Sequence, residues 1–165
     1  MERIIRGGLS VLLATIAGCG SATANDPGTF VNFADWCLHK AELLPDARHT
    51  VDVLLEEAGT QDCRRARRVL ASSPAPSLNL TDAQISNVEP LASFENLTRL
   101  DLRENQIVDV TPLANLVFLI ELYLEGNEIS DISPLANLTD LLKLSLDEQL
   151  LSDRSCPVQP ERICQ

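Results

Sequence analysis

The chain has 165 residues, enough for one domain with a small attached cap. It carries 24 Asp and Glu against 13 Lys and Arg, a formal net charge of −11, so it repels nucleic acid and anionic surfaces at long range. Apolar residues make up 45% of the chain but aromatic residues only 4%, so leucine and isoleucine must build the core. This composition is unusual for an enzyme pocket, and no nucleic-acid partner is expected.

Residues 1–18 predict a secretion signal. Arg3 and Arg6 form a basic start, and the apolar stretch 9–17 has the length of a signal core but is too short to span a bilayer as a stable helix. The tetrapeptide IAGC, which ends at Cys19, resembles the bacterial lipobox. That resemblance implies cleavage before Cys19 and acylation of this cysteine, and two or three acyl chains anchor a protein stably to a membrane.

A second cleavage site is also consistent with the sequence. Ala22-Thr23-Ala24 before Asn25 fits a small-x-small site, and cleavage there would discard Cys19 and release the protein as a secreted one. In the lipidated alternative, residues 19–29 form the anchor and a small, polar tether. The residue after the cysteine is Gly20 rather than Asp, which in the lipoproteins that this signal resembles favours the outer membrane.

Residues 30–76 predict a helical cap at the N-terminal end of the fold. Gly59 is suited to stop a helix, and the stretch SSPAP at 72–76 forms a junction. Three segments carry apolar side chains at helical spacing: Phe33, Trp36 and Cys37; Val51, Leu54, Leu55 and Ala58; Cys63, Ala66 and Leu70.

Residues 77–155 repeat with a period of 22 residues. The motif L-x-L alternates and predicts a short strand, so strands of successive coils should stack as a parallel sheet. Thr111 and Ser133, each followed by proline, predict N-caps of short helical turns on the opposite side. The repeated columns are Leu78, Leu100, Leu122 and Leu144; Leu80, Leu102, Leu124 and Leu146; Ile85, Ile107, Ile129 and Leu151; Val88, Val110 and Ile132.

The pattern L-x-x-L-x-L-x-x-N-x-I-x-x-I-x-P-L resembles the leucine-rich repeat of the internalin type. The resemblance implies an α/β solenoid, a short right-handed coil with a parallel sheet on its concave face. A buried amide at Asn105 and Asn127 should satisfy backbone groups where the chain leaves each strand. The preceding cap resembles the helical cap of some small secreted bacterial leucine-rich-repeat proteins.

The five cysteines divide into Cys19 and two local pairs. In an oxidising compartment we expect Cys37–Cys63 within the helical cap and Cys156–Cys164 within a C-terminal cap at residues 156–165. The alternative is a zinc site, since Cys37, His39, His49 and Cys63 all carry side chains that bind this metal. Its spacing is not that of a known zinc knuckle, so no metal or other cofactor is expected.

The concave face is the predicted site of function. A small polar binding face centred on Tyr123 is one interpretation, and simple pairing of Arg99 with Glu121 and Lys143, and of Arg103 with Glu125, is the other. The predicted binding residues are Arg99, Asp101, Arg103, Glu121, Tyr123, Glu125 and Lys143.

The basic run RRARR at 64–68 predicts either contact with anionic headgroups near the anchor or an ordinary solvated helix face. No set of nucleophile, histidine and acid is visible, so an enzyme is not expected. The leading hypothesis is a lipid-anchored module that binds a protein or envelope ligand at the bacterial cell envelope and touches the membrane only through its anchor. The alternative is a structural envelope lipoprotein without a dedicated ligand.

Overall fold

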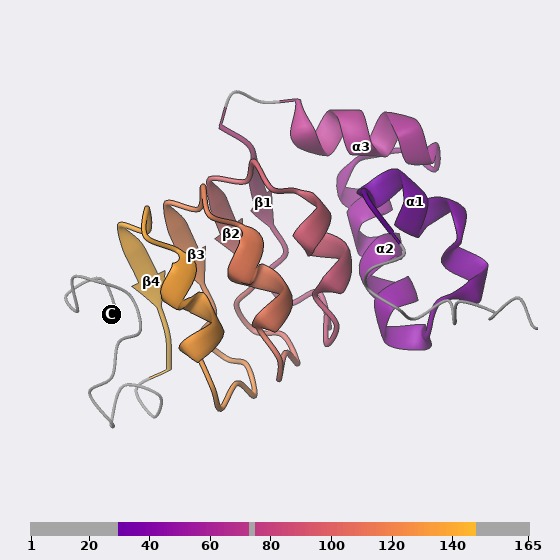
Figure 1. Ribbon diagram of the computed structural model, residues 1–165. Coiled ribbons are helices and arrows are strands. Elements are labelled where there is room, and N and C mark those ends of the chain that lie inside the picture. Colours follow the sequence, from indigo (N-terminus) through magenta and orange to yellow (C-terminus); the bar gives the residue numbers. More distant parts are fainter. Residues whose placement is uncertain (1–29, 73–74, 148–165) are drawn as a thin grey trace, which may run out of the picture.

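The computed structural model describes residues 30–72 and 75–147. Cys19, Cys156 and Cys164, the signal, the tether and the C-terminal cap lie outside these residues. The described chain begins with three helices, α1 (Phe33–Leu38), α2 (Pro45–Glu57) and α3 (Cys63–Ala71), and a short 3-10 helix, η1 (Lys40–Glu42), follows α1. Figure 1 shows them gathered at one end of the stacked coils that follow.

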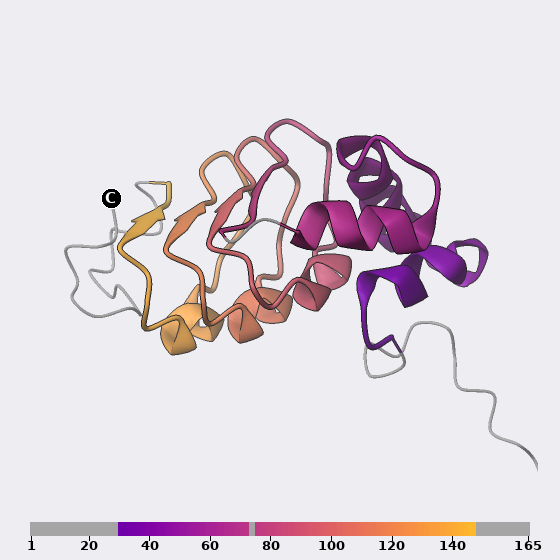
Figure 2. The same ribbon diagram turned by 90° about the horizontal axis from the view of Figure 1, so that it is seen from above.

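The coils form a four-stranded parallel sheet in the order β1-β2-β3-β4. The strands are β1 (Ser77–Asn79), β2 (Arg99–Asp101), β3 (Glu121–Tyr123) and β4 (Lys143–Ser145). Three 3-10 helices, η2 (Glu89–Ser93), η3 (Thr111–Asn115) and η4 (Ser133–Asn137), line the other side of the stack, as Figure 2 shows. Leu78 pairs with Leu100, Leu100 with Leu122, and Leu122 with Leu144, so each coil advances the register by 22 residues.

Leucine and isoleucine columns fill the space between the sheet and the 3-10 helices. Leu100, Leu102 and Ile107 are completely buried, and the equivalent side chains of the neighbouring coils are buried as well. They form one continuous core with the apolar side chains of the cap. This burial is the main source of stability, because apolar area removed from water stabilises the fold by about 25 cal/mol per Å².

The asparagine column satisfies backbone groups between coils, as predicted. Asn105 is buried; its Nδ2 donates to the carbonyls of Leu80 (2.8 Å) and Leu102 (2.9 Å), and its Oδ1 accepts from the Ile85 amide (2.9 Å). Asn127 repeats the arrangement one coil later, where its Oδ1 accepts from the Ile107 amide at 3.1 Å. Each asparagine therefore ties its own coil to the preceding one.

The predicted N-caps of the 3-10 helices are wrong by one position. Thr111 and Ser133 are the first residues of η3 and η4, and the residues before them, Val110 and Ile132, occupy the cap positions without a side-chain hydrogen bond. The bond comes from one residue further back: Asp109 Oδ1 accepts from the Thr111 amide, and Asp131 Oδ1 from the Ser133 amide, both at 2.8 Å. An aspartate hydrogen-bonds readily to the backbone two residues on, which explains the shift.

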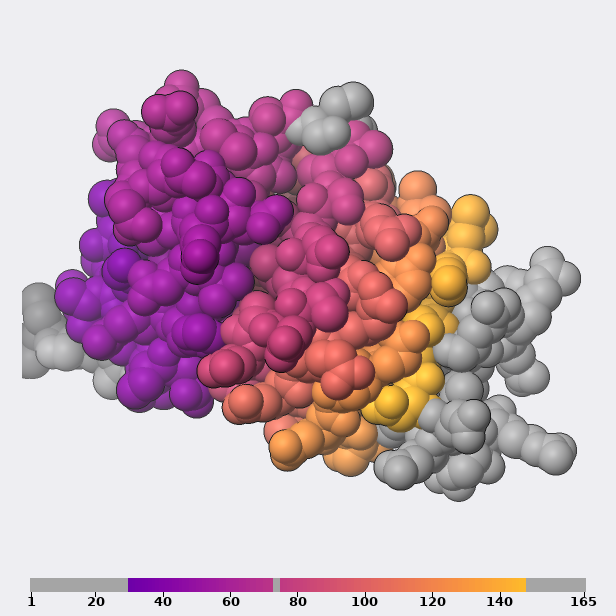
Figure 3. Space-filling model, turned by 180° about the vertical axis from the view of Figure 1, so that it is seen from behind, coloured from indigo at the N-terminus to yellow at the C-terminus, as the bar shows by residue number. Residues whose placement is uncertain are grey.

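The cap closes the first coil with a phenylalanine pair and two hydrogen bonds. The rings of Phe33 and Phe94 lie 5.3 Å apart, and both side chains are buried. From α2, His49 Nε2 donates to the Ala83 carbonyl (2.8 Å) and Thr50 Oγ1 to the Asn87 carbonyl (2.6 Å). Figure 3 shows from behind how closely the indigo and purple cap adjoins the magenta first coil.

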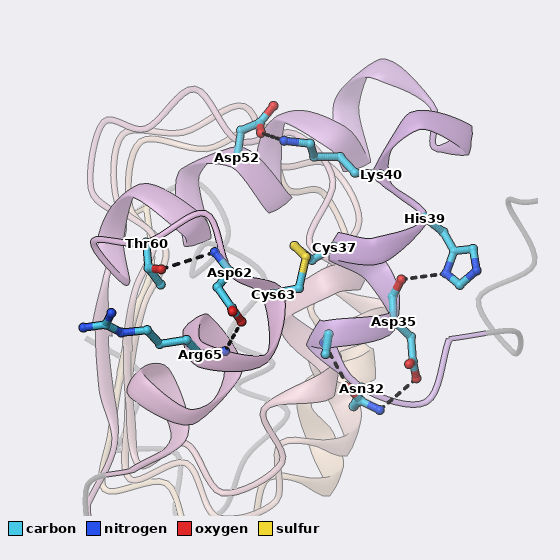
Figure 4. Close-up of a disulfide and its surroundings, with 11 residues drawn as sticks. Asn32, Asp35, Cys37, His39, Lys40, Asp52, Thr60, Asp62, Cys63 and Arg65 are labelled. Atoms are coloured by element: carbon cyan, nitrogen blue, oxygen red, sulfur yellow. Dashed lines mark hydrogen bonds and ion pairs between the residues drawn. A yellow bond between two sulfur atoms is a disulfide. The ribbon is translucent and has the colours of Figure 1, made fainter.

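A disulfide between Cys37 and Cys63 joins α1 to α3 across 26 residues (Figure 4). Asp62, just before Cys63, caps α3 by accepting from the Arg65 amide at 2.8 Å. The alternative zinc site is wrong, because both sulfurs are in the disulfide and neither is a thiolate that could bind the metal. His39 and His49 instead donate to backbone carbonyls, His39 through Nδ1 to Asp35 at 2.9 Å.

Candidate functional site

Strand pairing places five of the seven predicted binding residues on adjacent strands of one sheet. Arg99 is paired with Glu121 and Glu121 with Lys143, while Asp101 is paired with Tyr123. Paired residues of neighbouring strands stand about 4.8 Å apart, so their side chains are in direct reach of one another. Arg103 and Glu125 are the second residues after β2 and β3, and hydrogen bonds connect both to neighbouring residues of the same face.

Tyr123 is the centre of the face. Its ring lies beneath three cations, with the Arg99 guanidinium at 4.7 Å from the ring centroid, the Lys143 ammonium at 4.9 Å and the Arg103 guanidinium at 5.3 Å. Its hydroxyl donates to Glu121 Oε2 at 2.8 Å. Each cation is attracted to the negative face of the ring. These neighbours leave Tyr123 only 9% exposed, so a ligand would meet the cations first and the ring second.

Arg103 pairs with Asp101 and not with Glu125, the partner that one of the two sequence interpretations predicted. The guanidinium forks onto the carboxylate, with Nε at 2.9 Å from Oδ1 and Nη2 at 2.6 Å from Oδ2. Asp101 is buried, and its side-chain hydrogen bond to Arg103 holds the pKa of the carboxyl below its ordinary value, against the opposing effect of desolvation. The same bond raises the pKa of Arg103. The pair is charge-assisted and bidentate, a geometry that fixes the orientation of both side chains.

Glu125 takes another partner. Its Oε1 accepts a hydrogen bond from Ser145 Oγ, whereas its Oε2 is buried and has no hydrogen-bond partner in the described part of the chain. Next to it, the Gly126 amide donates to the Asp147 carboxylate, whose two oxygens lie at 3.1 Å. The carboxylates of this end of the face are therefore directed toward hydroxyl and amide groups.

Arg99 pairs with Glu121, as one of the two sequence interpretations predicts. The same interpretation also paired Glu121 with Lys143, and that part is wrong: within residues 30–72 and 75–147 Lys143 forms no ion pair, and its ammonium lies over the Tyr123 ring. The side chains of Arg99 and Arg103 are 44% and 43% exposed, so both guanidinium groups remain open to a ligand.

Two hydroxyl residues of the face were not among the predicted binding residues. Ser145 bonds to Glu125, and Thr81 Oγ1 lies 3.0 Å from Asp101 Oδ1. Both belong to the same 22-residue columns as the predicted residues, so the repeat register was the signal that points to them.

The structure also bears on catalysis and on metals. Both histidines belong to the cap, and each donates to a backbone carbonyl, so neither stands beside a hydroxyl of the concave face. Among residues 30–72 and 75–147, no group of three or more His, Cys, Asp or Glu side chains is arranged to hold a metal ion. In the same residues no helix is long and apolar enough to cross a membrane.

The fold is a leucine-rich-repeat solenoid with a helical N-terminal cap. Its coils are stacked, a parallel sheet forms one side, and Asn105 and Asn127 each tie their coil to the preceding one. A solved structure that it resembles is an internalin, InlF, from Listeria monocytogenes, with a TM-score of 0.55 and 27% sequence identity over 73% of this chain. The matched part is 33% of that internalin, so this chain corresponds to about a third of its length.

A second internalin from the same organism, InlC2, shares 41% identity over 50% of this chain and 37% of its own, with a TM-score of 0.40. No protein-family model matches the chain, and no curated protein does.

Proposed function

We propose that this chain is a lipid-anchored, non-enzymatic recognition module of the bacterial cell envelope, with its concave face as the surface that binds a protein or another envelope ligand. The observation that carries the proposal is the cluster around Tyr123. Arg99, Arg103 and Lys143 converge on one aromatic ring, and two of these cations have side chains more than two-fifths exposed. Arginine and aromatic side chains are typical anchors of protein interfaces.

The size of the face favours a modest affinity. Four strands at about 4.8 Å spacing make a sheet only about 15 Å wide, whereas a stable protein interface buries about 800 Å² on each partner. A short polar or acidic segment of a partner fits this width, since its carboxylates would complete the coordination of Lys143 and the two guanidinium groups. Such a contact should weaken as salt concentration rises.

Photo-crosslinking in cells tests the binding face. A photoreactive residue in place of Ser77, which is exposed on β1 in the same ladder as Arg99, should trap the ligand for mass spectrometry. The double variant Arg99→Gln, Lys143→Gln should abolish the crosslink, because it removes two cations from the cluster and leaves the buried core intact. The control, Lys40→Gln, removes one half-buried cation of the cap, which is ion-paired with Asp52 and lies outside the concave face, and should leave the crosslink unchanged.

A structural envelope lipoprotein without a dedicated ligand is the alternative function. The observation that favours it is mutual pairing, since Arg99 pairs with Glu121 and Arg103 with Asp101 within the face itself. A crosslinking pattern that is the same in the double variant and in the unmodified chain would support this alternative and contradict a concave binding site.

The anchor is proposed at Cys19, with the outer membrane as its location. Support comes from the lipobox-like IAGC tetrapeptide directly after the apolar run. We expect Cys19→Ser to leave an unprocessed precursor or to release the protein from the membrane fraction, and mass spectrometry of the mature N-terminus measures this directly. A mature chain that begins at Asn25 would instead show that the protein is secreted without a lipid.

A further inference from the structure

Four arginines of α3 form a positive surface on a strongly negative protein. Arg64, Arg65, Arg67 and Arg68 are all exposed, and none of them forms an ion pair within the described residues. The neighbouring Glu56 and Glu57 do not neutralise them by direct pairing. An exposed cation without a partner is fully available to an external anion, so this surface differs from the mutually paired concave face.

Three of these arginines open onto a hollow between α1 and α3. Arg64, Arg67 and Arg68 line one wall, and residues of the α1 segment, including Asp35 and Leu38, line the other around a volume of about 600 Å³. The Asp35 carboxylate is engaged by the Asn32 amide group at 2.8 Å and by the Val31 backbone amide at 3.2 Å. Asp62, which caps α3, accepts a hydrogen bond from the Arg65 amide at 2.8 Å, and this bond, with the Arg64 backbone amide and the charges of Arg68 and Arg64, holds the pKa of Asp62 below its ordinary value.

The chemistry of this hollow fits phosphate groups. A guanidinium presents a planar fork of N–H donors that matches the oxygens of a phosphate, and three such forks lie around one hollow. Leu38 in its wall is 60% exposed, and Val69 on α3 is 46% exposed, so apolar surface accompanies the charges. Arginines beside exposed aliphatic side chains are suited to the boundary between headgroups and acyl chains of a lipid layer.

The position of the hollow in the chain points to the membrane as the source of these phosphates. Asn32 lines the hollow, and Cys19 precedes Phe30 by only eleven residues. Eleven residues span at most about 40 Å when fully extended, so a lipid at Cys19 would keep α3 within reach of the bilayer. The rest of the surface belongs to a chain with a net charge of −11 and is repelled by anionic lipid, which favours approach through α3.

We propose that Arg64, Arg67 and Arg68 bind the phosphate headgroups of anionic phospholipids, and that α3 thereby holds the cap against the membrane. The inference rests on the proposed lipid anchor for its biological setting but not for its test. Each arginine near a charged bilayer strengthens binding about five-fold, so three of them make a second membrane signal next to the acyl chains.

Vesicle binding of the unlipidated full chain tests the proposal. The chain with Cys19→Ser is mixed with vesicles of phosphatidylcholine alone or of phosphatidylcholine with phosphatidylglycerol, and binding is measured by co-sedimentation. The signal segment, which carries Arg3 and Arg6, is the same in every variant, so a change of preference between variants reports the arginines of α3 alone. We expect the triple variant Arg64→Gln, Arg67→Gln, Arg68→Gln to lose the preference for anionic vesicles by a factor on the order of 100. In the chain that keeps the three arginines, the preference should decrease as the salt concentration rises.

Two controls make the result decisive. The variant Arg64→Lys, Arg67→Lys, Arg68→Lys should show a preference between those of the arginine chain and the glutamine variant, because it keeps the attraction to the charged bilayer but lacks the guanidinium forks. Circular dichroism should be the same for all variants because the three positions are exposed. Equal binding to both kinds of vesicle, or an undiminished preference in the glutamine variant, would overturn the proposal. The lipid anchor is tested by the mature N-terminus of the chain that retains Cys19, and the arginine surface by vesicle binding of the chain with Cys19→Ser. Either proposal can therefore be contradicted without the other.

Discussion

At the scale of single residues, Asn105 has the most concentrated set of hydrogen bonds in the solenoid. It satisfies two carbonyls and the Ile85 amide in a place that water does not reach. Asn105→Ala leaves these groups buried and unpaired, and each such group costs about 1–3 kcal/mol. We expect the free energy of unfolding in urea to fall by about 3 kcal/mol or more.

Asn96→Ala is the matched control for this prediction. Asn96 is exposed and makes one long hydrogen bond, 3.4 Å to the Ala71 carbonyl, so its loss should change the free energy of unfolding by less than about 0.5 kcal/mol. Similar losses for the two variants would mean that the amide of Asn105 does not tie the coils together.

The Asp101–Arg103 pair predicts how stability depends on pH. The hydrogen bond from Arg103 lowers the pKa of Asp101 in the folded protein. The pair therefore contributes its full stability above the unfolded pKa of Asp, about 3.9, and this contribution is lost as the pH falls through the pKa of the folded protein. In Asp101→Asn this contribution is absent at every pH. The stability gap between the unmodified chain and the variant should therefore narrow on acidification from about pH 6 to about pH 2.

Urea unfolding at several pH values measures that gap. Arg103→Gln removes the partner of the same carboxyl and should flatten the acid limb of the stability profile in the same way. A gap of constant size across the pH range would show that Asp101 does not titrate with the folding equilibrium.

Sequence reasoning predicted the asparagine contacts but not the partner of Arg103. The role of Asn105 follows from its place in the 22-residue repeat. At that place in a stacked coil, the polar groups beside the side chain are the backbone groups of its own coil and of the preceding one. Arg103, however, has two carboxylates in reach: Asp101 on its own coil and Glu125 on the next coil. The choice between them depends on side-chain rotamers and on the Thr81–Asp101 hydrogen bond, neither of which a sequence pattern contains.

At the scale of elements, the spacing of the leucines was sufficient to place every strand of the described solenoid. A residue that must point inward once per coil leaves only one register, since a shift by one position would turn the leucines to solvent. The conformation of the turns after the strands was harder to predict from the sequence. Asp82, Glu104 and Gly126 occupy equivalent left-handed positions with φ of 54°, 56° and 72°, and only the last is the glycine that such a backbone favours.

The helices of the cap were predictable from the sequence, but their docking onto the solenoid was not. Helical spacing predicted the buried faces of α2 and α3, and Gly59, with φ of 61°, follows α2 closely, as expected of a stop. The two bonds by which α2 docks onto the first coil were not predictable, because they use the backbone carbonyls of Ala83 and Asn87, whose position depends on the finished fold.

The disulfide is the covalent link between two cap helices, and its removal should weaken the cap. Closing a loop of this length restricts the unfolded chain by about 3.5 kcal/mol in the chain-entropy description. We therefore expect Cys37→Ala, Cys63→Ala to lose about 3 kcal/mol in urea unfolding. The unmodified chain treated with a reductant should lose a similar amount, and a variant as stable as the oxidised chain would contradict a structural role for this disulfide.

At the scale of the whole molecule, cap and solenoid are one hydrophobic body. Phe33 of α1 and Phe94 of the first coil belong to the same buried cluster as Leu144 of β4, the last described strand. An open solenoid exposes apolar surface at its end, and here the cap covers that surface with α2 and the phenylalanine pair. Loss of the cap therefore exposes the first coil, which couples the folding of the two parts.

The chain carries one tryptophan and one tyrosine, which makes this coupling measurable. Trp36 lies in the cap and Tyr123 in the third strand, so tryptophan emission reports the first part and tyrosine second-derivative absorbance the second. We expect the two urea transitions to coincide, since a two-state unit unfolds with the same midpoint for every probe. Thr50→Val removes the 2.6 Å hydrogen bond from α2 to the first coil, which should lower the free energy of unfolding by about 1–3 kcal/mol. Both urea midpoints should then move to lower concentration together. A tryptophan transition that precedes an unshifted tyrosine transition would show instead that the solenoid is stable without its cap.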